Sequence, residues 1–175
     1  MRKIAWMIWR ALANAQWFLI FAICFFLILF ITTEVIMRYL IHYPGMEVEE
    51  IATLIAFWFY FIGASYGAYN RTHIKAEMMH LVFKTPKKLA LSRSIATFIT
   101  LVLAGLMAYW GYLYFIWGIT KGERSRILQI PMVFSQISIF LSASLMFLYF
   151  LAELIDRLRQ AAGKKPIFLQ EDESK

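Results

Sequence analysis

Long runs of apolar residues, separated by short polar segments, dominate the chain. Four runs carry no charged residue: between Arg10 and Glu34, from Ile51 to Asn70, between Arg93 and Lys121, and between Arg126 and Glu153. A helix rises about 1.5 Å per residue, so about 20 residues cross a hydrocarbon core of roughly 30 Å. The runs lack the regular polar positions of a soluble helix. They therefore predict four transmembrane helices at about residues 12–34, 50–70, 94–120 and 131–153.

The polar segments between the runs predict short helices at the membrane surface. Basic residues alternate with tryptophans in residues 1–17, which is typical of an interfacial anchor. In the second connection, the apolar residues between Ile74 and Val82 share one helical face, which predicts an amphipathic helix at headgroup level. Thr85 and Pro86 are suited to cap and start the next helix. We expect one membrane domain over residues 1–160 and a polar cytoplasmic tail over 161–175.

The distribution of lysine and arginine predicts which side of the membrane each connection faces. Of the 18 basic residues, 14 lie in the N-terminal segment, the second connection or the C-terminal tail. The other four lie in the first and third connections: Arg38, Lys121, Arg124 and Arg126. Because positive charge accumulates on the cytoplasmic side, both termini and the second connection are predicted to be cytoplasmic.

Composition supports an all-α integral membrane protein and excludes several other classes. Hydrophobic residues make up 61% of the 175 residues and charged residues 17%, against roughly 45–50% and about 25% in soluble domains. The net charge is +7, and the basic residues that produce it lie in short segments beside the apolar runs, where anionic lipid headgroups would attract them. This distribution does not predict nucleic-acid binding. The single cysteine, Cys24, excludes an intrachain disulfide and a thiolate zinc site.

Residues that could carry chemistry are absent from the interior of the predicted spans. No span holds a charged residue near its middle, where ion and proton pathways usually place one. The three histidines, His42, His73 and His80, all lie in connections, which argues against haem ligation. There is also no phosphate-binding loop, nucleophile motif or metal-ligand spacing. We therefore expect no enzyme, no cofactor, no metal and no transport pathway within this chain alone.

Small residues share one face of the second predicted span. On a helical wheel, Ala52, Ala56, Gly63 and Gly67 fall within an arc of about 60°, with Glu49 at one end of that arc. Small residues allow membrane helices to approach closely. We hypothesise that this face packs against another helix.

Glu49 and Glu50 precede this span, and their carboxylates can be interpreted in two ways. A carboxylate at a helix N-terminus is favoured by the helix dipole, which alone could account for both. Alternatively, they form a salt bridge with a partner or with Arg38 across the first connection. Arg38 is also four residues after Glu34, so these two side chains are suited to pair.

The order of motifs resembles the small, Q-type permease subunit of TRAP (tripartite ATP-independent periplasmic) transporters over roughly residues 10–160. The resemblance is carried by EEIA at Glu49–Ala52, FIGASYGA at Phe61–Ala68, HIKAE at His73–Glu77 and SRILQIP at Ser125–Pro131. It implies a scaffold subunit in the bacterial inner membrane, which anchors a large M-type subunit that carries substrate and sodium. It also implies a periplasmic binding protein that delivers a carboxylate substrate, with sialic acid as one candidate. The residues expected at partner interfaces are Glu49, Glu50, Ala52, Ala56, Gly63, Gly67, Arg71 and His73.

Two other functions are compatible with four spans. A membrane anchor of a respiratory haem or quinone complex would also have a partner, but the spans contain no histidine. A small oligomeric exporter would need a buried acid at mid-span, and Glu34 lies too near a helix end. Substrate identity is not readable from this sequence, because the substrate is expected to contact other chains.

Overall fold

The computed structural model describes residues 2–70 and 86–161, which form four helices and two short connections. The helices are α1 (Arg2–Tyr39), α2 (Met46–Asn70), α4 (Pro86–Lys121) and α5 (Val133–Ala161). Within the described residues there is no strand, and Arg124 and Pro131 form an isolated bridge. The all-helical fold is as predicted, and α4 begins at the expected proline. The predicted amphipathic helix before Thr85 and nearly all of the predicted tail lie outside the described residues.

All four helices are long and apolar enough to cross a membrane. The helix α1 has 38 residues and α4 has 36, which corresponds to lengths of roughly 57 and 54 Å. Both exceed a hydrocarbon core of roughly 30 Å. Their ends therefore extend past the hydrocarbon, and the basic residues near the start of α1 fall in such an end.

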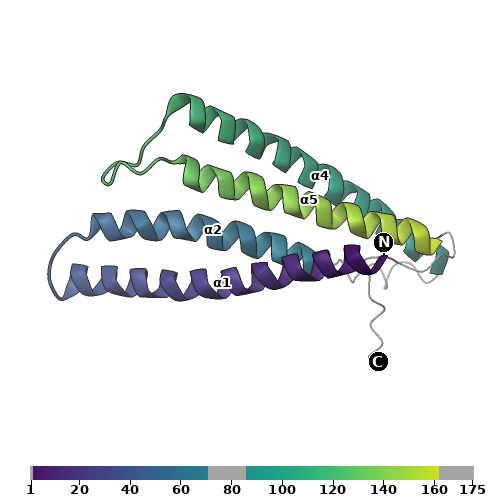
Figure 1. Cartoon of the computed structure of the whole chain (residues 1–175), viewed down its shortest axis with the longest axis horizontal. Helices are drawn as coiled ribbons and strands as arrows, with labels where there is room; N and C mark the ends of the chain where they lie inside the picture. Colours follow the sequence, from purple (N-terminus) through teal and green to yellow (C-terminus); the bar gives the residue numbers. More distant parts are fainter. Residues whose placement is uncertain (1, 71–85, 162–175) are drawn as a thin grey trace.

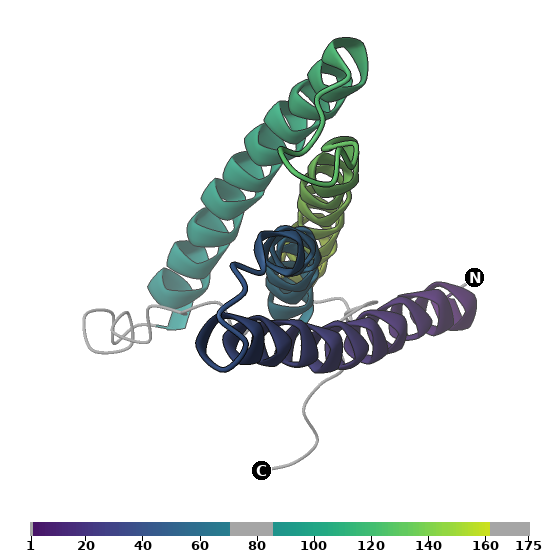
Figure 2. The same ribbon diagram turned by 90° about the vertical axis from the view of Figure 1, so that its left-hand side faces the viewer.

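The helices lie in a row in the order α1, α2, α5, α4 (Figures 1 and 2). Each helix packs along its length only on its neighbours in that row. The two described connections lie at one end of the molecule, and the start of α1 and the end of α5 lie at the other (Figure 1). Neighbours joined by a connection are therefore antiparallel, whereas α2 and α5 run in parallel. Seen end-on, α1 and α4 diverge from the central pair (Figure 2).

The contact between α4 and α5 follows a regular pattern of buried positions. The least exposed positions of α4 form one stripe along the helix, the buried α4 stripe. They recur alternately after four and three residues: Thr97, Leu101, Ala104, Ala108, Gly111, Phe115 and Gly118. This spacing is the signature of left-handed helix pairing. Glycines within or beside the stripe admit bulky residues of α5: Gly105 lies beside Phe147, and Gly111 lies against the backbone of Phe140.

The core of this row is small because most side chains face outward. A buried cluster gathers around Tyr149 and Phe150 of α5, with Ala68 of α2 and Leu101 and Ala104 of α4. Most large apolar side chains of α1 and α4 are exposed within the chain. Such a surface requires lipid or another apolar protein as its surroundings.

Glycines with positive φ angles stand at the two connections. Gly45 has φ +62° and accepts hydrogen bonds from the amides of Val48 and Glu49 at the start of α2. Gly122 has the same φ and follows the last residue of α4, with its amide bonded to the carbonyl of Gly118. Left-handed backbone at such points favours glycine, which lets the chain leave or enter a helix sharply.

Candidate functional site

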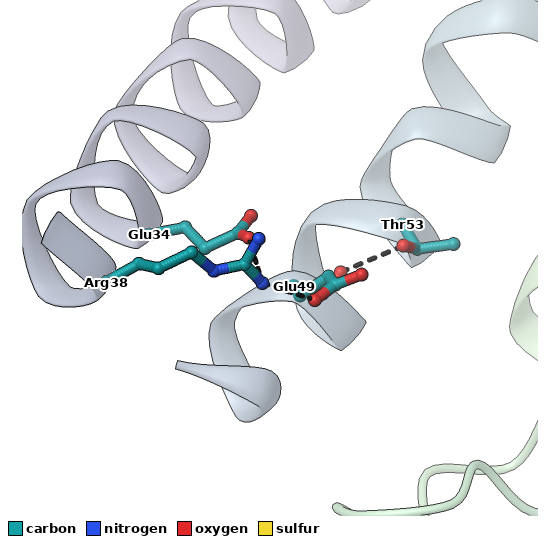
Figure 3. Close-up of polar contacts among 4 residues, drawn as sticks. All are labelled: Glu34, Arg38, Glu49 and Thr53. Atoms are coloured by element: carbon teal, nitrogen blue, oxygen red, sulfur yellow. Dashed lines mark hydrogen bonds and ion pairs between the residues drawn. The ribbon is translucent and has the colours of Figure 1, made fainter. Parts of the chain in front are cut away.

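Arg38 joins α1 to α2 at the connected end of these helices (Figure 3). Its Nη2 lies 3.2 Å from Glu34 Oε1, one turn earlier on α1, and 3.2 Å from Glu49 Oε2 on α2. Both pairs agree with the readings from the sequence. The arginine lies in the last turn of α1 and Glu49 in the first turn of α2, where each charge complements its helix dipole. Exposed pairs of this kind contribute about 0.2–1 kcal/mol each.

Glu50 binds the backbone of the α4–α5 connection. Its Oε2 accepts a hydrogen bond of 2.8 Å from the amide of Leu128, and its Oε1 accepts one of 3.4 Å from the amide of Ile127. Successive backbone N–H groups directed at one anion form a nest, and bonds to a charged acceptor are stronger than neutral ones. Glu50 therefore ties α2 to a loop that is distant in sequence.

The connection that Glu50 binds is also held by its own hydrogen bonds. The amide of Ser125 donates to the carbonyl of Ile130 at 2.9 Å, and the amide of Ile130 donates back to Ser125 Oγ at 2.9 Å. The amide of Met132 donates to the carbonyl of Glu123 at 3.0 Å. These bonds close a small hairpin-like turn, although both Ile127 and Leu128 at its tip are exposed. The adjacent carboxylates of α2 thus fix both connections at this end of the row.

A second polar cluster joins three helices inside the membrane-spanning region. The Gln16 amide of α1 donates from Nε2 to Ser65 Oγ of α2 at 2.7 Å. The hydroxyl of Tyr149 on α5 donates to Gln16 Oε1 at 2.7 Å. All three side chains are buried, and hydrogen bonds between membrane helices contribute about 0.6 kcal/mol on average. The cluster therefore fixes the register of α1, α2 and α5.

Aromatic rings surround this three-helix cluster. Trp9 of α1 meets Tyr149 edge-on with ring centroids 4.8 Å apart, and Tyr69 of α2 meets it at 5.5 Å. We did not predict this site from the sequence. The feature of the sequence that could have indicated this site is Gln16. Its amide lies three residues after Ala13, on the buried face of a largely apolar helix. An amide buried on an apolar face must find a partner, because an unpaired one costs free energy.

A third polar group lies buried between α4 and α5. Gln136 is 1% exposed, and a methyl group added at Gly118 would collide with its amide. Neither amide atom of Gln136 has a hydrogen-bond partner among the described residues, and the same is true of Ser135 Oγ. An unmade hydrogen bond of this kind costs about 1–3 kcal/mol. These unpaired groups therefore weaken the α4–α5 contact beside its connection.

The arrangement of these groups suits mechanical joining of helices. In the described part of the chain, no group of three or more His, Cys, Asp and Glu side chains could hold a metal ion. The charged side chains described above lie near helix ends, and the buried amide and hydroxyls of the three-helix cluster bond to one another. The clusters around Arg38, Glu50 and Gln16 each connect different elements of the row, so together they set the spacing and register of the helices.

The predicted interface residues fall into three groups. Glu49 and Glu50 make the intrachain contacts described above. Ala52 is buried within the chain, Ala56 is half-buried, and a Cβ placed at Gly63 would have no atom within 4 Å. Gly67 is half-buried. Arg71 and His73 lie outside the described residues. The small-residue face is therefore covered within the chain at its Ala52 end and open at Gly63.

Comparison with known proteins gives one family match. A family model described as "Tripartite ATP-independent periplasmic transporters, DctQ component" matches residues 27–160. The match begins within α1, includes α2 and α4 entirely, and ends at the last turn of α5. A search of curated proteins finds no match for the chain.

Proposed function

The chain belongs to the DctQ component family of TRAP transporters, and from this premise we propose that it is the scaffold subunit of a sodium-coupled uptake system. In this proposal it holds a large M-type subunit in the bacterial inner membrane. A periplasmic binding protein delivers the carboxylate substrate, with sialic acid as one candidate. The family is a transporter component and not an enzyme family, which favours this role over the anchor of a respiratory complex.

The observation that carries the scaffold role is the open row of helices. A chain that carried substrate alone would need polar groups lining an interior between helices at mid-depth. In the described residues, each helix packs along its length on its neighbours in the row, and the buried polar groups, including the Tyr149–Gln16 bond between α5 and α1, join helices together. The described helices present a wide apolar surface. These features suit a part that holds other parts in place.

The proposed orientation places both termini in the cytoplasm and both described connections in the periplasm. It rests on the distribution of basic residues along the chain. The shared placement of the two connections at one end of the row is compatible with it. In this orientation, the Glu50-bound connection faces the side from which a binding protein would arrive.

The small-residue face is proposed to contact the large subunit at its open part. Gly63 has free space around it within this chain, so a partner helix has room to approach there. Gly67 continues the same face, and Arg71 and His73 follow it in sequence. Glu49 and Glu50 are assigned to holding the connections, because their carboxylates are already engaged within the chain.

Co-purification tests the proposal directly. The full chain would be co-expressed with its presumed large subunit, with an affinity tag on one protein only, and extracted in mild detergent or nanodiscs. We expect a stable complex that survives size-exclusion chromatography. An unrelated four-span membrane protein of similar size, carrying the same tag, serves as the control. Separate elution of two folded proteins would contradict the scaffold role.

A further inference from the structure

The two outer helices of the row, α1 and α4, differ in the chemistry that they expose at the middle of the membrane. The span of α1 runs from Trp9 to Tyr39, and the span of α4 runs from Ser94 to Lys121. Each packs along its length on one neighbour, α1 on α2 and α4 on α5, and near its start α1 also contacts Tyr149 of α5. Their remaining sides therefore face either lipid or another protein.

The middle of α1 exposes hydrocarbon side chains. Phe21, Phe25, Phe26 and Ile28 lie around the centre of its span, and each is more than half exposed. Phenyl and aliphatic groups have no polar atom to satisfy, so lipid tails are suitable surroundings for them. Nothing about this surface requires a protein partner.

The middle of α4 exposes aromatic side chains with polar atoms. Tyr109 is 57% exposed and Trp110 is 63% exposed. The centre of the span falls between Met107 and Ala108. The backbones of Tyr109 and Trp110 therefore lie roughly 2 and 4 Å along the helix from the centre of the span, at 1.5 Å per residue. Among the described residues, neither the Tyr109 hydroxyl nor the Trp110 indole N–H has a hydrogen-bond partner. Both point away from the buried α4 stripe by their helical spacing from Gly111.

This placement is unfavourable in lipid. Tyrosine and tryptophan concentrate at membrane interfaces, where the ring is in hydrocarbon and the polar atom reaches the headgroups. From the centre of a core roughly 30 Å thick, the interface is about 15 Å away, beyond the reach of either side chain. An unsatisfied polar group in the hydrocarbon costs free energy that lipid tails cannot offset. Tyr60 of α2 is also exposed near the centre of its span. Because α2 is a central helix, this residue does not bear on the choice between α1 and α4.

We propose that the outer surface of α4, comprising Leu106, Tyr109, Trp110, Leu113, Ile116 and Trp117, is a docking surface for another membrane protein. All six side chains are exposed within this chain. The partner is an apolar transmembrane helix that presents hydrogen-bond acceptors at mid-depth, such as hydroxyls or carbonyls of an interrupted helix. Resting on the proposed function, we identify that helix as part of the large subunit. The outer surface of α1 faces lipid.

Site-specific photo-crosslinking tests this assignment in the complete complex. Benzoylphenylalanine would replace Tyr109 in one variant and Phe25 in a matched control, each co-expressed with the large subunit and irradiated in native membranes. We expect an adduct between the two subunits from position 109 and none from position 25. Any other pattern in an assembled complex overturns the assignment.

A second variant measures the hydrogen bond itself. Tyr109→Phe keeps the ring and removes the hydroxyl, and we expect roughly threefold weaker association with the large subunit, as for an average hydrogen bond between membrane helices. Phe25→Leu serves as the control and should leave association unchanged. Unchanged association of the Tyr109→Phe protein would contradict the proposed docking. Co-purification of the unmodified chains is measured in parallel, so failure of the whole complex is distinguished from a wrong choice of helix.

Discussion

Glu49 and Glu50 show how two adjacent carboxylates act on different elements. They follow each other in the first turns of α2, and successive helical residues point about 100° apart. Glu49 therefore meets Arg38 of α1, while Glu50 meets the amides of Ile127 and Leu128. The first contact was one of the alternatives that the sequence left open, because Arg38 lies just across a short connection. The second was not predictable, because it depends on how α5 and its connection are placed beside α2.

Removal of the Glu50 charge should loosen the α4–α5 connection. In Glu50→Gln, a neutral amide replaces the carboxylate that accepts from the loop amides, so those bonds lose their charge assistance. We expect faster hydrogen exchange at the amides of Ile127 and Leu128 in detergent-solubilised protein, because local opening costs less. Glu49→Gln is the matched control, since it breaks the contact with Arg38 and leaves the loop amides bound. Equal exchange in the two variants would show that Glu50 does not hold the loop.

The Gln16–Tyr149 hydrogen bond should couple α1 to α5. A double-mutant cycle with Gln16→Leu and Tyr149→Phe, followed by unfolding in mixed micelles, measures this coupling. We expect about 0.6 kcal/mol, and up to about 1.7 kcal/mol, because both groups are buried and the bond joins membrane helices. Tyr112→Phe serves as the control, since its hydroxyl has no hydrogen-bond partner among the described residues. A cycle with no coupling would contradict the geometry of this cluster.

At the scale of the elements, the uncharged runs predicted four membrane helices because a span must bury about 20 apolar residues. The helices extend beyond the predicted limits where polar residues continue a helix past the hydrocarbon, as in the first turns of α1. The order of helices in the row was not predictable. Burial periodicity on α4 and α5 becomes visible only once the helices are packed, since the apolar residues surround α4 on all sides.

The glycines of α2 and α4 should respond differently to the same substitution. A Cβ at Gly111 would lie 3.2 Å from the Phe140 Cα, whereas one at Gly63 meets no atom within 4 Å. In the isolated chain, Gly111→Leu should separate α4 from α5 and lower the free energy of unfolding by about 1–3 kcal/mol, the usual cost of overpacking. Gly63→Leu should leave that free energy unchanged. The measurement is unfolding in mixed micelles.

The same pair of variants also tests the small-residue face in the complex. If the large subunit approaches at Gly63, the Gly63→Leu chain should fold normally and yet assemble less of the complex in co-purification. Normal assembly of this variant would remove Gly63 from the interface. In either outcome, Gly111→Leu reports on packing inside the chain.

At the scale of the whole molecule, the described helices form a row of four spans, which is compatible with the proposed scaffold role. Its polar groups hold helices and connections in place, and the exposed surface of both outer helices consists largely of apolar and aromatic side chains. A structure of this kind suits the proposed role, in which the chain acts through the subunits that it binds. The sequence indicated this through the lack of charge at mid-span, and the family match assigns the chain to a transporter component.

The most direct test of the scaffold role is uptake of substrate into proteoliposomes with one component omitted at a time. The full set contains this chain, the large subunit and the periplasmic binding protein, with an inward sodium gradient. We predict uptake from the full set, none from this chain with the binding protein alone, and a large loss when this chain is omitted. Uptake by this chain without the large subunit, or undiminished uptake in its absence, would contradict the account.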